Sequence, residues 1–177
     1  MEEAVHTARL FGADVVLRAD RAERASIVFG GFDRIGCDTL AAAAARTPFV
    51  FMALGCAGRT ANSSWTFFLE PEGGVAATGA LLWHPALERY GAAQLNARFA
   101  ERLGRPMTGA AWAGWMSVKI ALEAALRARA ADPVSLREVL TGPIRFDGHK
   151  GGPLGFDASH RLVQPLYTMK GEPMEDR

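Results

Sequence analysis

Short, unbroken apolar runs are the main feature of the first part of the chain. They are Ser26–Phe29, Pro48–Leu54 and Trp65–Leu69, and the first two stop at Gly30 and Gly55. Continuous apolar runs that end at glycine are typical of buried parallel strands. Ala41–Ala45 lies between the first two runs and predicts a helix, because alanine has the highest helix propensity. This order predicts a strand–helix–strand unit with a right-handed crossover.

The second part of the chain has helical periodicity. An amphipathic helix is predicted over residues 88–103, where apolar residues recur at i, i+4 and i+8: Leu95, Phe99 and Leu103. Gly104 should end it. A longer helix is expected from a cap at Thr108 to about Ala131, with one apolar face formed by Trp112, Trp115, Met116 and Ile120. We interpret both tryptophans as core residues rather than as a platform for a ligand.

The remaining segments are shorter. Residues 2–12 predict a helix and residues 13–18 a strand, and Asp132-Pro133 should break the long helix before a short one at 135–140. The glycine-rich stretch 148–155 predicts a hairpin-like turn rather than a phosphate cradle. Residues 162–169 have the composition of a strand, and the polar end after them is expected to be disordered.

The predicted order of elements is α/β, with a layered parallel sheet and flanking helices. We expect a single domain over residues 1–177. Residues 1–71 would form its strand–helix–strand part. Residues 75–177 would form a return segment with long helices and a C-terminal strand.

Composition narrows the possible functions. The chain has 177 residues, of which 49% are hydrophobic and 22% charged, enough for one hydrophobic core. The net charge is +1 and the basic residues are scattered, which argues against a nucleic-acid surface. No run is long and apolar enough to span a bilayer. The acidic start, Met1–His6, has no basic region followed by an apolar one, so no secretion signal is predicted there.

The turn after the first strand is the first candidate site. Gly30, Gly31, Phe32 and Asp33 lie where a strand is followed by a predicted helix. Crevices at the carboxyl ends of parallel strands bind ligands, and helix N-termini favour anions. The turn fits neither the dinucleotide-binding nor the P-loop pattern. The alternative is a tight turn in which Asp33 caps the following helix.

The turn after the next strand contains Gly55 and Cys56. If the two strands pair in parallel, this turn lies beside the first one, and Cys56 lies near the start of the helix that carries Cys37. A disulfide between Cys37 and Cys56 would then tie the two turns together in an oxidising compartment. Two separate, buried cysteines are the alternative.

The sequence predicts no catalytic site, no cofactor and no metal site. The histidines, His6, His84, His149 and His160, have no second ligand at metal-binding spacing. Ser63-Ser64 lacks the sequence of a nucleophile elbow. The carboxylates Glu70, Asp147 and Asp157 lie near turns, and we interpret them as caps and turn residues.

Several motifs together resemble the type I periplasmic binding proteins of the Leu/Ile/Val-receptor family. They are V-F-G-G-F-D at 28–33, P-F-V-F-M-A-L-G-C at 48–56, W-T-F-F-L-E-P at 65–71, L-L-W-H-P-A-L-E-R-Y-G-A-A-Q-L-N-A-R-F at 81–99, and the tail from Thr108 through F-D-G at 146–148 and G-x-L-x-F-D at 152–157. Within that family the chain looks most like the substrate-binding component associated with PQQ-dependent alcohol dehydrogenase systems.

The resemblance implies a binder rather than an enzyme. Such receptors hold a small ligand between two lobes that close by a hinge motion, and they deliver it to a membrane permease of an ABC uptake system. The first-lobe contacts would fall at the two turns, which here means Gly31, Phe32, Asp33, Gly55 and Cys56. The resemblance also implies a periplasmic location.

The chain departs from the family pattern in one respect. Between Pro71 and Val75, where the family inserts most of a second α/β lobe, only Glu72-Gly73-Gly74 is present. We therefore expect a shortened receptor with half of its cleft missing. The alternative function is an α/β interaction or sensory module that no longer binds a ligand and forms a homodimer through an exposed apolar face.

Overall fold

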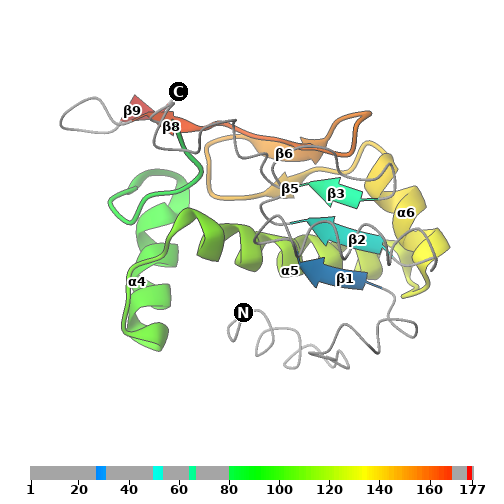
Figure 1. Ribbon diagram of the computed structural model, residues 1–177, viewed down its shortest axis with the longest axis horizontal. Coiled ribbons are helices and arrows are strands. Elements are labelled where there is room, and N and C mark those ends of the chain that lie inside the picture. The colour runs from blue at the N-terminus through cyan, green and yellow to red at the C-terminus, as the bar shows by residue number, and fades with distance from the viewer. Residues whose placement is uncertain (1–26, 31–49, 54–63, 67–79, 169–174, 177) are drawn as a thin grey trace.

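The computed structural model describes residues 27–30, 50–53, 64–66, 80–168 and 175–176, with side-chain environments for residues 81–167. Figure 1 shows three helices, α4, α5 and α6, beside a parallel sheet and two small antiparallel sheets. The α/β class expected from the sequence is confirmed. The predictions for residues 2–18, 41–45 and Cys37 lie outside the described residues.

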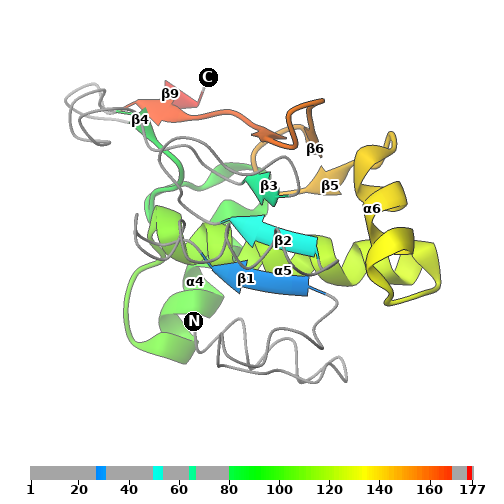
Figure 2. The same cartoon turned by 45° about the vertical axis from the view of Figure 1, so that its right-hand side comes forward.

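The parallel sheet has the order β1-β2-β3. Its strands are β1 (Ile27–Gly30), β2 (Val50–Ala53) and β3 (Ser64–Thr66), and both neighbouring pairs are parallel. Each of the three apolar runs overlaps a strand, as predicted, and the structure places the three strands side by side. Figures 1 and 2 place α6 at the side from which these strands start and α4 at the side toward which they point.

The helices follow the predicted local signals closely. α4 (Ala92–Leu103) ends at Gly104, whose φ of 64° is left-handed and suits glycine. α5 (Gly109–Ala128) begins after Thr108, whose side chain accepts a hydrogen bond from the amide of Ala111. α5 runs along the sheet from the α4 side to the α6 side (Figure 2).

Two small antiparallel sheets complete the fold. One contains the hairpin of β5 (Phe146–Asp147) and β6 (Pro153–Phe156), with β7 (Leu162–Val163) beside β6. The other pairs β4 (Ala80–Leu81) and β9 (Glu175–Asp176) with β8 (Tyr167–Thr168). The hairpin confirms the predicted turn in the glycine-rich stretch.

The core lies between the helices and the hairpin. Among the described side chains, the largest that are fully buried are Trp112, Phe146, Met107, Met116, Ile120, Leu136 and Leu140. The Trp83 and Trp112 rings stack with centroids 5.9 Å apart, and Phe146 meets Phe156 edge-on at 6.4 Å. Trp112 is a core residue, as predicted.

Several predicted boundaries were wrong. The long helix ends at Ala128 instead of Ala131, because Arg129 adopts a left-handed φ of 52°. Asp132-Pro133 does not only separate two helices: Asp132 caps α6 (Pro133–Thr141), and Pro133 occupies its first turn, where no amide is needed.

The ends of two other elements also differ from the prediction. The helix expected over 88–103 begins as a separate 3-10 turn, η2 (Arg89–Gly91), because Tyr90 has a φ of 55°. The strand expected over 162–169 is two strands, since residues 164–166 leave the ladder and Pro165 has no amide to donate. The polar end expected to be disordered contributes β9.

Candidate functional site

The predicted ligand turns follow the carboxyl edge of the parallel sheet. Gly30 ends β1, Ala53 ends β2, and these two residues are register partners. The sheet therefore brings the two strand ends together, as the parallel pairing predicted. The ligand residues Gly31, Phe32, Asp33, Gly55 and Cys56, and the pair Cys37–Cys56, lie outside the described residues, so these predictions remain untested.

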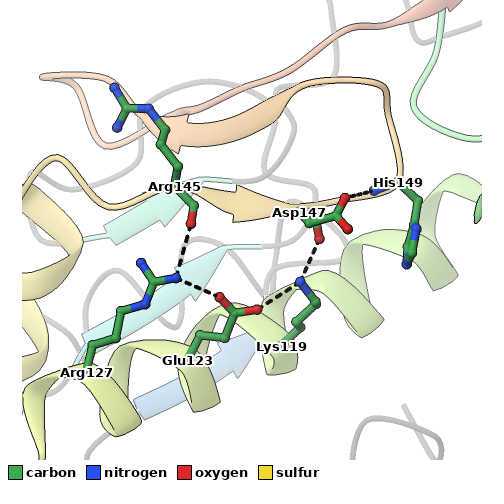
Figure 3. Close-up of polar contacts among 6 residues, drawn as sticks. All are labelled: Lys119, Glu123, Arg127, Arg145, Asp147 and His149. Carbon is green, nitrogen blue, oxygen red and sulfur yellow. Dashed lines mark hydrogen bonds and ion pairs between the residues drawn. The ribbon is translucent and has the colours of Figure 1, made fainter. Parts of the chain in front are cut away.

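A cluster of aromatic rings and an imidazole lies on the same side of the molecule. His149, in the β5–β6 turn, stacks on Trp115 of α5 with ring centroids 5.6 Å apart. Its Nδ1 atom lies 2.9 Å from the carbonyl oxygen of Tyr90. Figures 1 and 3 show this turn on the side toward which β1 and β2 point. We call Tyr90, Trp115 and His149 the aromatic–imidazole cluster.

The backbone of this cluster is strained. Tyr90 has a φ of 55° and His149 a φ of 58°, in the left-handed region that side chains disfavour. The contact between the His149 imidazole and the Tyr90 carbonyl links these two strained residues. The Tyr90 side chain is 56% exposed, and its ring lies against Gly151, where a Cβ atom would lie 2.6 Å from that ring.

A row of charged side chains on α5 covers the open edge of β5 (Figure 3). Lys119 donates to the Asp147 carbonyl at 2.7 Å, and Arg127 donates to the Arg145 carbonyl at 3.4 Å. Glu123 lies between the two cations, 2.8 Å from Lys119 and 3.3 Å from Arg127. These contacts satisfy two carbonyls that the β5–β6 ladder leaves unpaired, which fixes the hairpin on the helix.

Lys150 is a buried cation at the other side of the same turn. Its side chain is 4% exposed, and its Nζ atom lies 4.2 Å from the Trp112 ring centre and 5.3 Å from that of Tyr167. The ammonium donates to the Leu82 carbonyl at 2.6 Å, to Oε1 of Gln164 at 2.9 Å and to the Pro165 carbonyl at 3.0 Å. Burial lowers the pKa of Lys150 to about 7.

Asn96 of α4 organises the loop that precedes the helix. Its Nδ2 group donates to the carbonyls of His84, Pro85 and Leu87, and its Oδ1 atom accepts from the Trp83 indole at 2.8 Å. A shallow hollow of about 340 Å³ lies beside it, lined by this loop and by small residues of α4. The Asn96 amide is fully occupied by these bonds, so it offers the hollow no free polar group.

Asp147 and Asp157 serve turns, as predicted, whereas Glu70 lies outside the described residues. Asp147 accepts from the His149 amide, and Asp157 accepts from the amides of Ser159 and Arg161. Partial burial raises the pKa of Asp157, but the hydrogen bonds from Arg161 and Ser159 and the charge of Arg161 leave it below its usual value. Hydrogen bonds from Ser135 likewise lower the pKa of the Asp132 carboxyl at the start of α6.

The described residues contain no group of three or more His, Cys, Asp or Glu residues placed to hold a metal ion. None of their helices is long and apolar enough to cross a membrane.

No protein-family model and no curated protein matches the chain. Several solved structures are similar to it. A solute-binding protein of an ABC transporter from Rhodopseudomonas palustris BisB5, in complex with 3,4-dihydroxybenzoic acid, is 15% identical with a TM-score of 0.48, over 89% of this chain and 59% of that one. A branched-chain amino-acid ABC transporter periplasmic ligand-binding protein from Burkholderia xenovorans LB400 is 14% identical with a TM-score of 0.45, over 77% and 42%.

A third similar structure is the leucine-binding protein of Thermotoga maritima MSB8. It is 14% identical with a TM-score of 0.43, over 99% of this chain and 47% of that one. The chain thus spans about half the length of the solved structures that it matches.

Sequence reasoning missed Lys150, Tyr90 and Asn96, and it considered His149 only as a metal ligand. Lys150 carries no local signal, because its acceptors are 14, 15 and 68 positions away. A weak signal existed for Asn96, since it is a polar residue next to the apolar stripe that begins at Leu95. Tyr90 and the glycine after it, Gly91, both have left-handed backbones. In the sequence, only this glycine indicated a turn at Tyr90.

Proposed function

We propose that the chain is the ligand-facing part of a solute-binding protein of an ABC uptake system. The observation that carries this proposal is the register of β1 and β2. Gly30 and Ala53 are partners at the carboxyl edge, and each strand leads directly into a predicted ligand turn. The sequence motifs of periplasmic receptors at these same turns add to it. No chemical step is part of the proposal.

In this proposal, Gly31, Phe32, Asp33, Gly55 and Cys56 line the ligand side of the sheet. Asp33 would pair with a cationic group such as an ammonium, and Phe32 would cover the apolar part of the ligand. The partner would be a membrane permease that receives the ligand, and the location would be the periplasm. An association with PQQ-dependent alcohol oxidation rests on the sequence resemblance alone.

A thermal-shift screen tests the proposal. Amino acids and aromatic acids come first, because the similar solved structures include a leucine-binding protein and a complex with 3,4-dihydroxybenzoic acid. Alcohols, aldehydes and PQQ follow. A ligand that binds only the folded state at about 100 times its Kd should stabilise it by about 3 kcal/mol.

Matched variants localise any ligand found. We expect Asp33→Asn to weaken binding of a cationic ligand at least tenfold in calorimetry, whereas Asp176→Asn, in β9, leaves binding unchanged. A cooperative melt that no compound shifts would contradict the receptor proposal. Equal binding by both variants would place the ligand away from the first turn.

A second candidate is a self-associating α/β module. Leu126, near the end of α5, is 74% exposed, and Val134, in the first turn of α6, is 64% exposed. An interface would need these side chains to form part of one contiguous apolar patch. Sedimentation velocity at rising concentration decides this point: a dimer that Leu126→Lys dissociates would support self-association, and a monomer throughout would exclude it.

A further inference from the structure

Two glycines make room for the rings of the aromatic–imidazole cluster. A Cβ atom at Gly91 would lie 2.8 Å from Nδ1 of His149, and a Cβ atom at Gly151 would lie 2.6 Å from the Tyr90 ring. Gly91 directly follows Tyr90, and Gly151 lies two positions after His149. Each ring therefore lies on the backbone of a glycine close to the other ring's residue. A side chain at either glycine would displace one of the two rings.

The backbone at the two rings is not the one that their residues prefer. Tyr90 and His149 both have a left-handed φ although they carry large side chains. Strained residues of this kind concentrate at binding and catalytic sites, where the surrounding fold holds them in place. The β5–β6 turn, which carries His149, lies on the side toward which β1 and β2 point (Figures 1 and 3). The proposed ligand turns follow those strands.

The hydrogen bond of His149 fixes which of its ring nitrogens carries the proton. Its Nδ1 atom lies 2.9 Å from the Tyr90 carbonyl oxygen. A carbonyl oxygen can only accept, so Nδ1 is the donor, and the neutral imidazole has its free lone pair on Nε2. Within the described part of the chain, no hydrogen bond reaches Nε2, and the side chain is half-buried. The cluster therefore offers a hydrogen-bond acceptor, in a ring that Trp115 supports by stacking.

The Tyr90 side chain offers an aromatic surface in the same cluster. Its ring lies against Gly151, and yet the side chain is 56% exposed. An aromatic ring that packing holds in place can take a second aromatic ring in stacked or edge-on contact. The cluster thus combines a surface for a flat ring with an acceptor for a donor group. A phenol is the simplest ligand that has both parts.

We propose that Tyr90 and His149 form a contact site for a phenol, whose ring packs on Tyr90 and whose hydroxyl group donates a hydrogen bond to Nε2 of His149. This inference rests on the proposed receptor function, to which it adds a ligand class, hydroxylated aromatic compounds. The hydroxyl proton is essential to it. A methyl ether of similar shape has no proton to donate and would leave Nε2 without a hydrogen bond.

Calorimetry on the full chain with three probe compounds tests the site. We expect 4-methylphenol to bind at least about tenfold more tightly than 4-methylanisole, which has no donor, and than 4-methylcyclohexanol, which has no aromatic ring. His149→Asn and Tyr90→Asn should each weaken binding of 4-methylphenol by a similar factor, and asparagine tolerates the left-handed backbone of both positions. His160→Asn is the matched control, because His160 also has a φ of 58° but lies in the turn between β6 and β7. It should leave binding unchanged.

A second measurement needs no variant. In the unaltered protein, the nitrogen NMR signal of Nε2 of His149 should move when 4-methylphenol is added and stay in place with 4-methylanisole. Equal affinity for the phenol and the ether would overturn the site. Phenol binding that leaves the Nε2 signal in place would also overturn it, and so would the absence of binding by all three probes.

The same NMR signal separates this inference from the receptor proposal. A compound from the thermal-shift screen that stabilises the chain without moving the Nε2 signal, in a chain that does not bind 4-methylphenol, would support the receptor and contradict the phenol site. If neither the screen nor the three probes give binding, both proposals are wrong.

Discussion

Single polar residues decide how the loops of this protein are held. Asn96 fixes the loop before α4, Lys150 fixes the segments beside β4 and β8, and His149 holds the strained Tyr90. Each of these side chains binds at least one backbone carbonyl of a loop or turn. Replacing such a residue lowers the free energy of unfolding mainly because it leaves backbone acceptors without a hydrogen bond.

Asn96→Asp tests how much such hydrogen bonds contribute to the free energy of unfolding. The carboxylate keeps an acceptor for the Trp83 indole but has no donor for the carbonyls of His84, Pro85 and Leu87, and it brings negative charge toward them. We expect the free energy of unfolding in urea to fall by at least about 2 kcal/mol. Gln94→Glu makes the same chemical change at an exposed position of α4 and should stay within about 0.5 kcal/mol.

At the scale of elements, α5 and the β5–β6 hairpin form one unit. Four residues of an α-helix rise about 6 Å, close to the length of two residues of a strand. Trp115 and Lys119 of α5 therefore meet His149 and Asp147 of the hairpin in order, with the two elements running in opposite directions. The Trp112 indole also donates to the Gly148 carbonyl at 3.1 Å.

The glycines of the hairpin turn give a prediction at this scale. A Cβ atom at Gly148 would overlap the Leu154 side chain and lie 3.1 Å from the Trp112 ring, whereas Gly152 has nothing within 4 Å. Gly148→Ala should therefore lower stability by about 1–3 kcal/mol through overpacking.

Gly152→Ala is the control for that variant, and we expect it to leave stability within about 0.5 kcal/mol. Urea denaturation of both variants makes the comparison. Equal effects would mean that the hairpin does not pack on α5 as closely as these contacts indicate.

On the scale of the whole molecule, the structure combines a parallel sheet, a helical layer and two small antiparallel sheets. Half of the buried residues of the described core come from α5, α6 and the hairpin. The Lys150 amine is buried in the folded chain, which disfavours its charged form, and global unfolding exposes it to water. Its pKa therefore differs between the folded and unfolded states, and stability must depend on pH.

The sign of this dependence follows from the lowered pKa of Lys150. Its pKa is about 7 in the folded protein against an ordinary value of 10.5. Between these two values the unfolded chain binds more protons, so stability rises with pH, by up to about 1 kcal/mol per pH unit. The gain is complete above about pH 10.5 and is lost as the pH falls to about 7.

Urea denaturation between pH 6 and pH 10 measures this slope. Other groups also titrate in this range, so the decisive quantity is the difference from Lys150→Met, which should lack the contribution. Lys119→Met should keep it. Identical pH profiles for the unaltered protein and Lys150→Met would show that the acceptors and aromatic rings restore the ordinary pKa of Lys150.

The sequence by itself determined the parallel strands, the three helices, and the ends of α4 and α5 at Gly104 and Thr108. These features depend on signals within a few residues of each other, such as the glycines after the strands, Thr108 before α5 and Gly104 after α4. The turn roles of Asp147 and Asp157 are local for the same reason. The residues predicted to bind a ligand follow from strand ends, and they remain a proposal.

Only the tertiary structure decided which polar residues are buried and which backbones are strained. Lys150 is a cation in a glycine-rich turn, a context that ordinarily indicates an exposed side chain. Its burial depends on acceptors from Leu82, Gln164 and Pro165, which come together only when the fold is complete. The strained pair of Tyr90 and His149 joins residues 59 positions apart, and no local pattern encodes such a contact.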